Sequence, residues 1–450
     1  MSRDRSYQET IEYLYGLQKH GIKLALSNTV KLMQLLGDPH RRFPSAHIAG
    51  TNGKGSTAAF IASMLRTAGY RVGLYTSPHL VSFTERIRIN NAVIPEAKVV
   101  ELAQRVRDAW RGAAATDGRG ELITTFFEVT TAIAFAYFAD ENVDIAVIET
   151  GMGGQFDSTN VITPLVSVIT NIDLEHQEFL GTTLEQIAIE KAGIIKPCVP
   201  VVTGTVQPEA VNVIEREALA KNAPIYRLSQ HFQPKNIIPG TVQTFDYQGL
   251  ADAYSALRIT MLGAYQVDNA CLALAAIECL RRAAGLSLDE HAVRHGLEQA
   301  RWDGRLERVA NRPDIYLDGA HNPASAKKLA QAIREMKPAY QRTILIIGIL
   351  GDKDYLGVLS ELVPLADHVV ATKPQYSRAL DVATLATEIR RLHTSVDMAE
   401  TLETAITQAR TTALPDDLVL ITGSLYVVGD ARALFFPEAD RTGALSGLKG

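Results

Sequence analysis

Short apolar stretches alternate with longer amphipathic stretches along most of this chain, a pattern typical of parallel β-sheets covered by helices. In the first part, the apolar stretches predict strands over residues 46–49, 72–75, 145–148, 166–170 and 199–203. Between them, the amphipathic stretches predict helices over 58–70, 96–111, 126–139 and 184–191. The last of these helices is predicted to begin with a capping box, Thr182-x-x-Glu185, and to end at Gly193.

The pattern changes twice in the second half. Short alternating runs between residues 225 and 262 predict a small antiparallel insertion, and a long helix follows over 266–284. After about residue 300 a second series begins, with strands over 315–318, 343–347, 368–372 and 418–421 and helices over 324–336 and 385–392. We therefore expect an α/β protein of two domains. Residues 1–298 form a P-loop-type, mostly parallel sheet domain, and residues 299–450 form a smaller Rossmann-like domain.

Composition narrows the class of protein. With 45 basic and 50 acidic residues the net charge is −5, which argues against binding to nucleic acid or to an anionic membrane. Three cysteines without a Cys-x-x-Cys spacing predict neither a disulfide framework nor a structural zinc site. The chain starts without the apolar segment of a secretion signal, and its longest apolar run, 344–350, is too short to span a bilayer. We expect a cytoplasmic enzyme.

The segment Gly-Thr-Asn-Gly-Lys-Gly-Ser-Thr, residues 50–57, lies between a predicted strand and a predicted helix. Glycines let the backbone approach phosphate oxygens, and a helix N-terminus adds partial positive charge there. Lys54 is predicted to reach the terminal phosphates, and the hydroxyl of Ser56 or Thr57 to bind Mg²⁺. The spacing is shorter than in the usual nucleotide loop, since only two residues separate Gly50 from Gly53. The segment predicts binding of a nucleoside triphosphate.

Polar residues also follow two other predicted strands of the first domain. Glu149 opens a glycine-rich loop over residues 149–160, and the run from Asn171 to His176 follows the strand over 166–170. The carboxyl ends of parallel strands form the usual crevice of an open α/β sheet. A carboxylate at this edge is a good ligand for a hard cation. Taken alone, His176 fits a surface or capping residue, and Lys191 fits a favourable charge at a helix C-terminus. Next to a phosphate loop, Glu149 and His176 become metal-ligand candidates.

Together these segments resemble the folylpolyglutamate synthase/dihydrofolate synthase family, within the Mur-type ATP-dependent amide ligases. The matching segments run in the family's order over nearly the whole chain: 50–57, 77–80, 83–87, 126–128, 149–160, 190–193, 269–270, 304–307, 318–323 and 352–354. Two positions depart from the usual pattern, with Gln155 where many relatives carry Arg and Glu175 where many carry Asp.

The resemblance implies a set of site residues. Those for ATP are Asn52, Gly53, Lys54, Gly55, Ser56, Thr57, Asn269, Arg305 and Asp318. Those for metal are Ser56, Ser77, Glu149, His176 and Lys191, the last matching a lysine that is carbamylated in this family. Those for the folate or pteroate are Phe126, Phe127, Glu128, Phe156, Asp157 and Ser158, and those for glutamate are His321 and Ser424. Lys54, Glu149, His176 and Lys191 are the expected catalytic group.

The activity that the resemblance implies is ATP-dependent addition of L-glutamate to a folate, through an acyl phosphate. It implies ATP and two Mg²⁺ ions, with a monovalent cation as a further candidate, and small-molecule partners for a monomeric protein. Adding the first glutamate to dihydropteroate and extending folates that already carry glutamate both fit the sequence. Two alternatives stay open: a sister ligase of cell-wall precursors, against which the segments 77–80 and 83–87 argue, and a nucleotide-dependent switch without ligase activity.

Overall fold

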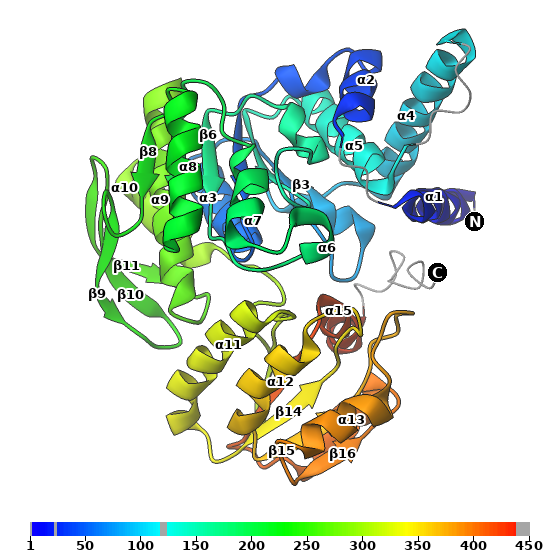
Figure 1. Cartoon of the computed structure of the whole chain (residues 1–450), viewed down its shortest axis with the longest axis vertical. Helices are drawn as coiled ribbons and strands as arrows, with labels where there is room; N and C mark the ends of the chain where they lie inside the picture. The colour runs from blue at the N-terminus through cyan, green and yellow to red at the C-terminus, as the bar shows by residue number, and fades with distance from the viewer. Residues whose placement is uncertain (1, 22–24, 118–123, 438–450) are drawn as a thin grey trace. The chain divides into compact units, whose positions relative to one another are not determined.

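The computed structural model describes residues 2–21, 25–117 and 124–437, which form two compact units (Figure 1). The first unit contains residues 1–79, 83–260 and 266–301 of the chain, and the second contains 80–82, 261–265 and 302–450. The expected division after residue 298 and the observed division after Arg301 lie close together. The two short segments of the second unit that interrupt the first were not expected.

An eight-stranded sheet in the order β4-β3-β2-β5-β1-β6-β7-β8 forms the centre of the first unit. Six of its strands, from β2 to β8 in that order, are parallel, and β3 and β4 are antiparallel at one edge. The strands are β1 Ser45–Ala49, β2 Val72–Tyr75, β3 Ile87–Ile89, β4 Ala92–Val93, β5 Ile145–Glu149, β6 Val166–Ile169, β7 Val201–Thr203 and β8 Ile225–Arg227. All residues of β1, β2, β5, β6 and β7 are buried, as expected for parallel strands covered on both faces.

Helices surround this sheet, and a small separate sheet follows it in sequence (Figure 1). The helices are α1 Ser2–Gly16, α2 Ser27–Leu35, α3 Lys54–Thr67, α4 Glu96–Asp117, α5 Phe126–Asp140, α6 Gln177–Leu180, α7 Leu184–Ala192, α8 Pro208–Ala220, α9 Tyr265–Ala284 and α10 Glu290–Gln299. The predicted antiparallel insertion is confirmed as a three-stranded sheet of β9 Gln233–Ile238, β10 Gln243–Gln248 and β11 Ala253–Ile259.

The predicted capping box of α7 is wrong by one residue. The N-cap is Thr183, whose hydroxyl accepts from the backbone N–H of Gln186, while the Gln186 side chain accepts from the Thr183 N–H. Two adjacent threonines each have a polar side chain three residues later, so the sequence offers two registers. The structure uses the second register, and the Gln186 side chain also accepts from the Thr182 N–H.

The second unit is a doubly wound sheet in the order β12-β13-β17-β14-β15-β16, parallel except for β12. Its strands are β12 Glu307–Ala310, β13 Asp314–Leu317, β14 Thr343–Ile347, β15 His368–Ala371, β16 Val396–Met398 and β17 Leu418–Thr422. Its helices are α11 Pro323–Met336, α12 Tyr355–Leu362, α13 Val382–Arg390, α14 Leu402–Thr412 and α15 Leu425–Phe435.

Alternate residues of β14 enter two different apolar cores of the second unit. Leu345 and Ile347 pack in one core with α11, α12 and α13, whereas Ile344 and Ile346 pack in the other with α14 and α15. Helices on both faces of a parallel sheet are the expected result of a strand with four consecutive apolar residues, here 344–347. The expected fold class, a mostly parallel α/β domain followed by a smaller α/β domain, is confirmed.

Candidate active site

Residues 50–53 form a tight loop between β1 and α3, and two of its glycines cannot be replaced without strain. Gly50 has φ +148°, and a Cβ there would lie 1.9 Å from Thr170 Oγ1. Gly53 has φ +84°, and a Cβ there would lie 2.5 Å from Asn269 Oδ1. Both positions combine a left-handed backbone with a crowded surrounding, so glycine is required. The second contact also places Asn269, a predicted ATP residue, beside the loop.

The N-terminus of α3 is an anion-binding arrangement. Its N-cap is Gly53, which has no side chain with which to cap the first backbone N–H groups. In contrast, α5 and α7 are closed by capping boxes from Thr125 and Thr183. The Thr57 hydroxyl in the first turn of α3 is buried and has no hydrogen-bond partner among the described residues. The first backbone N–H groups of α3 and the Thr57 hydroxyl are therefore available to donate hydrogen bonds to an anionic ligand.

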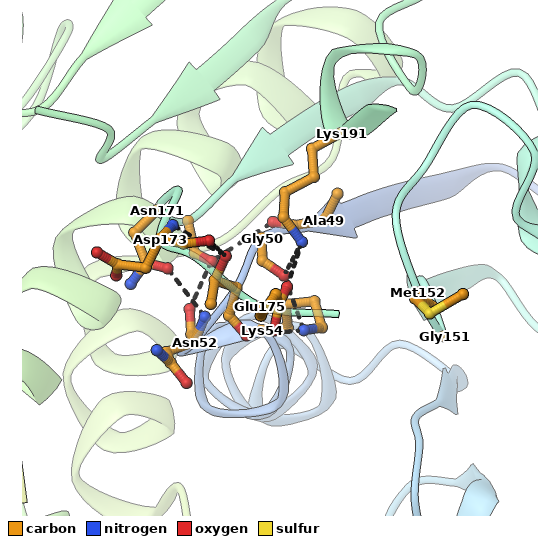
Figure 2. Close-up of polar contacts among 12 residues, drawn as sticks. Ala49, Gly50, Asn52, Lys54, Gly151, Met152, Asn171, Asp173, Glu175 and Lys191 are labelled. Carbon is orange, nitrogen blue, oxygen red and sulfur yellow. Dashed lines mark hydrogen bonds and ion pairs between the residues drawn. The ribbon is translucent and has the colours of Figure 1, made fainter. Parts of the chain in front are cut away.

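Two lysine ammonium groups converge on the loop from different helices (Figure 2). Lys54 Nζ of α3 donates to the carbonyl oxygens of Gly50 (2.8 Å) and Thr51 (3.0 Å), while Lys191 Nζ of α7 also donates to Gly50 O (2.8 Å). Lys191 is almost fully buried and forms an ion pair with Glu175, Nζ to Oε1 2.6 Å. The sequence placed both lysines in the site, but gave no sign that they meet at one carbonyl.

Burial and mutual charge shift the pKa values of this pair. Burial raises the pKa of Glu175, but the positive charges of Lys191 and Lys54 outweigh it and hold the value at about 2. Burial lowers the pKa of Lys191, and the nearby Lys54 adds to this against the opposing charge of Glu175. Glu175 is therefore ionised over the physiological range.

The strand end after β6 fixes the other side of the loop. The Asn171 backbone oxygen accepts from Thr51 N (3.0 Å), and its side-chain oxygen accepts from Asn52 N (2.9 Å). The Thr170 hydroxyl donates to Asn52 O (2.6 Å). Sequence reasoning singled out the polar run after this strand but assigned Thr170 and Asn171 no role. They hold the loop in shape, as Figure 2 shows for Asn171.

The structure brings together some of the predicted metal ligands. Glu149, at the end of β5, is buried, and its Oε2 accepts from Ser77 N (3.1 Å) just beyond the neighbouring strand β2. His176 is exposed and occupies the N-cap of α6 with φ +45°, next to Glu175 in the chain. Among the residues that the structure describes, no group of three or more His, Cys, Asp or Glu side chains could hold a metal ion.

Aromatic side chains form a wall at the start of α5. Phe126 stacks on Tyr15 of α1 with ring centroids 5.7 Å apart, and Phe127 stacks on Tyr75 of β2 at 6.0 Å. The Phe127 ring lies so close to Gly151 that a Cβ there would come within 2.5 Å of it. Sequence reasoning did not identify Tyr15, because no motif marks it.

Glu128, in the same turn of α5, uses only one side-chain oxygen locally. Its Oε2 accepts from the Thr125 N–H (2.6 Å) and from the Asn28 side chain (3.4 Å). Its Oε1 is buried and accepts no hydrogen bond within the described part of the chain. This oxygen is the kind of acceptor that a bound ligand with N–H groups can satisfy.

The loop over residues 150–160 is bonded internally and to α7. The Asp157 carboxylate is buried and accepts from the backbone N–H groups of Gly151 (2.9 Å), Met152 (2.9 Å) and Thr159 (3.0 Å). Gln155 N donates to Glu190 O (2.7 Å) on α7. Asp157 was predicted as a folate contact, and its oxygens are largely taken up by its own loop. Ser158 is likewise buried, whereas Phe156 is exposed.

Four predicted residues lie in the second unit. Asp318, His321 and Ser424 follow the carboxyl ends of the adjacent strands β13 and β17, and Arg305 precedes β12, whose start pairs with the end of β13. Asp318 is buried and accepts from Leu306 N (3.0 Å) and Ala320 N (2.9 Å). Burial raises its pKa, against the opposing charge of Arg305. His321 Nδ1 lies 2.8 Å from Gly319 O, and the Ser424 hydroxyl caps α15 by accepting from Val427 N (3.0 Å).

Comparison with known proteins agrees with this arrangement. Residues 48–277 match the Mur ligase middle domain, and residues 304–425 match the Mur ligase glutamate ligase domain. The chain is 38% identical to the Bacillus subtilis dihydrofolate synthase/folylpolyglutamate synthase, covering 95% of this chain and 98% of that protein. It is 35% identical to the Lacticaseibacillus casei folylpolyglutamate synthase, with coverage of 95% and 98%.

Solved structures show the same likeness. The Mycobacterium tuberculosis folylpolyglutamate synthase complexed with ADP superimposes with a TM-score of 0.89 at 36% identity, covering 96% of this chain and 99% of that one. The Escherichia coli FolC in complex with DHPP and ADP superimposes with a TM-score of 0.86 at 29% identity, with coverage of 96% and 98%. In the described part of this chain, no helix combines the length and apolar character needed to cross a membrane. The chain belongs to the folylpolyglutamate synthase/dihydrofolate synthase family of the Mur ligases.

Proposed function

We propose that this protein joins L-glutamate to a folate and to dihydropteroate at the expense of ATP. The observation that carries the proposal is the loop over residues 50–53, where the Lys54 ammonium group lies at the uncapped N-terminus of α3 and the Lys191 side chain reaches the same carbonyl oxygen, that of Gly50. The names of the relatives, which include both synthase activities, support the choice of substrates. A carboxylate is a poor electrophile, so it first takes the γ-phosphoryl group of ATP to give an acyl phosphate and ADP. The amine of glutamate then attacks the carbonyl carbon, phosphate leaves and a proton is released.

Positioning and charge neutralisation are the main tasks of the protein in such a reaction. Two of the three N–H donors of Lys54 are used within the loop, which leaves its charge fixed and one donor for a phosphate oxygen. The first-turn N–H groups of α3, from Lys54 to Ser56, add further donors. Asn269, whose side chain abuts Gly53, is proposed to contact the nucleotide beside them.

We propose Mg²⁺ as the accompanying metal, bound by hard oxygen ligands. The donor set fits: Glu149 supplies a buried carboxylate, Ser77 lies beside it, and the Thr57 hydroxyl is buried without a partner among the described residues. Ser56 and His176 complete the proposed set. When bound, Mg²⁺ would neutralise part of the negative charge of the ATP phosphates. These residues suit Mg²⁺ because most of their donor atoms are oxygens, the ligand atoms that Mg²⁺ prefers.

Lys191 is proposed to act as a carbamate. In that modification the neutral amine attacks CO₂, a C–N bond forms and one proton is released. Burial favours the neutral amine because it lowers the pKa of Lys191, to which Lys54 adds against the opposing charge of Glu175. The product is anionic and offers two oxygen ligands of the type that Mg²⁺ prefers. A free ammonium at the same place would instead repel the metal.

The folate or pteroate is proposed to lie along the aromatic wall of Phe126 and Phe127. Apolar faces of this kind accept a flat heterocycle, and the unsatisfied Oε1 of Glu128 can accept from its N–H groups. Phe156 adds an exposed ring, and Asp157 and Ser158 support it from within the loop.

The second unit is proposed to supply the remaining contacts: Arg305 and Asp318 for ATP, and His321 and Ser424 for glutamate. We further propose that the protein is monomeric and acts in the cytoplasm. Residues 299–450 are proposed to form its glutamate-ligase domain. A monovalent cation remains a proposed additional ligand.

The decisive experiment measures ADP release by the full chain with dihydropteroate and with tetrahydrofolate, each with and without L-glutamate. We expect release that requires both the pteridine substrate and glutamate, and products heavier by one or more glutamates in mass spectrometry. ADP release that depends instead on a cell-wall nucleotide precursor and an amino acid would identify a sister ligase. Turnover of ATP that no carboxylate substrate stimulates would identify a nucleotide-dependent switch.

A further inference from the structure

His47 is fully buried in β1, the strand that leads into the loop over residues 50–53, and is not among the residues proposed to bind ATP, metal, folate or glutamate. Its Nε2 lies 2.8 Å from the Thr159 hydroxyl, a contact between residues 112 positions apart. Thr159 is also fully buried and belongs to the loop over residues 150–160, which carries the exposed ring of Phe156. His47 therefore connects the central strand of the sheet to that loop.

The direction of the hydrogen bonds follows from what each group can donate. Both oxygens of the Asp157 carboxylate accept from backbone N–H groups, and these hydrogen bonds oppose the effect of burial, which raises the pKa of Asp157. An ionised carboxylate can only accept. The Thr159 hydroxyl lies 2.5 Å from Asp157 Oδ1 and donates its single hydrogen there. Its oxygen must then accept from His47, which requires the hydrogen on Nε2. The neighbours of His47 thus select one tautomer.

The other ring nitrogen and the protonation state agree with this assignment. Nδ1 of His47 is buried and has no hydrogen-bond partner in the described part of the chain, as expected of the nitrogen that carries no hydrogen. Burial lowers the pKa of His47 to about 3, and the charge of Lys196 contributes. The imidazole is therefore neutral at physiological pH.

We propose that His47 is a positioning residue for the folate-binding loop: its Nε2–H orients the Thr159 hydroxyl, which holds Asp157 and, through it, the backbone of Gly151 and Met152. This backbone packs against Phe127 at Gly151, so the chain of hydrogen bonds ends at the aromatic wall. The inference rests on the proposed function for its substrate but not for its geometry. The loop over residues 50–53 is held separately, by hydrogen bonds that join Asn52 to Thr170 and Asn171. Loss of the His47 donor should therefore act on folate binding rather than on ATP binding.

Two substitutions separate the hydrogen bond from the space that the side chain fills. His47→Leu has a similar size and no donor, whereas the amide N–H₂ of His47→Gln can reach the place of Nε2. Leaving a buried hydroxyl without one of its partners costs an amount equal to about 5- to 150-fold in an equilibrium constant. We expect His47→Leu to raise the KM for the folate substrate by about that factor, with the KM for ATP changed less than about twofold. His47→Gln should recover most of the loss.

The Thr159 partner provides the matched pair. Thr159→Val also removes the hydrogen bond to Asp157, so its effect should be at least as large as that of His47→Leu. The double variant should be no worse than Thr159→Val alone, and Thr159→Ser should stay close to the wild type. Equal rises in both KM values, or a His47→Gln variant as poor as His47→Leu, would overturn the proposal, as would strictly additive effects of the two apolar substitutions.

A readout that needs no substrate tests the geometry itself. In protein labelled with ¹⁵N-histidine, long-range ¹H–¹⁵N correlations identify the tautomer of His47, assigned by its disappearance in His47→Gln. We expect an Nε2–H tautomer that does not change between pH 5 and 9, and a displaced signal in Thr159→Val. An Nδ1–H tautomer, or titration within this range, would refute the inference. If the wild type does not ligate folates, the proposed function fails while this measurement still decides the role of the hydrogen bond.

Discussion

Replacing Glu175 by glutamine removes the carboxylate that pairs with Lys191 and preserves the shape of the side chain. The pKa of Glu175 falls from the usual 4.5 to about 2, because the two lysine charges outweigh the effect of burial. At about 1.4 kcal/mol per pKa unit, this corresponds to roughly 3 kcal/mol of folding free energy at pH 7. The side chain of Glu175 is 11% exposed, so solvent screening is weak. We expect Glu175→Gln to lose about 2–3 kcal/mol, since the amide oxygen retains a hydrogen bond to Lys191.

The stabilisation that Glu175 contributes should decrease as the pH falls. The folded-state pKa of Glu175 lies below the unfolded value, so the stabilisation is complete above about pH 4.5 and is lost as the pH falls through about 2. At pH 3 the same two values leave only about 1.4 kcal/mol. The difference between wild type and Glu175→Gln should therefore shrink by more than half between pH 7 and pH 3.

Urea unfolding of protein free of metal, nucleotide and CO₂ measures this difference. In a Trp302→Phe background the remaining tryptophan, Trp110 of α4, reports on the first unit. The control is Glu217→Gln, because Glu217 also forms a 2.6 Å ion pair, with Lys221, but both of these side chains are partly exposed to solvent. That variant should lose less than about 0.5 kcal/mol. A loss at Glu175 no larger than the control, or one that is the same at pH 3 and pH 7, would refute the reasoning.

Substitutions at three residues of the proposed catalytic group provide further tests. Lys54→Ala should lower turnover by roughly 10²–10³-fold in the ADP-release assay, and near-normal ligation would exclude its proposed role at the phosphates. His176→Ala should raise the Mg²⁺ concentration needed for half-maximal activity and recover partly with Mn²⁺, which binds some protein ligands more tightly; lower activity with an unchanged metal dependence would show that it is not a ligand. Lys191→Arg, which keeps a charge but cannot carry a carbamate, should be as inactive as Lys191→Ala, and only the alanine variant should respond to small added carboxylates; wild-type turnover of the arginine variant would leave a helix-capping role.

Sequence alone determined those features whose cause is local. The strands β5, β14 and β17 are buried along their whole length, and each appears in the sequence as a mainly apolar run with one polar residue at its end. The loop over residues 50–53 can be recognised in the sequence for a similar reason. A left-handed backbone restricts the residue type at the position itself, so Gly50 and Gly53 mark the loop.

Local patterns were less able to decide between neighbouring registers. The capping box of α7 was placed at Thr182 because that residue and Thr183 both satisfy the motif, and only the packed helix selects Thr183. The start of α3 was placed at residue 58, four residues too late, because the run from Lys54 to Thr57 has little amphipathic pattern of its own. In both cases the sequence contains the signal, and its position depends on contacts elsewhere.

The tertiary structure alone decided which polar groups meet. Lys191 donates to Gly50 O across 141 residues of sequence, and His47 contacts Thr159 across 112. Neither pair has a fixed spacing, because a parallel sheet brings strand ends together whatever the length of the connections between them. Burial also changes the protonation of these groups, because desolvation lowers the pKa values of both Lys191 and His47. A sequence names such side chains, but their partners and their protonation follow from the fold, because both depend on distance and on exclusion of water.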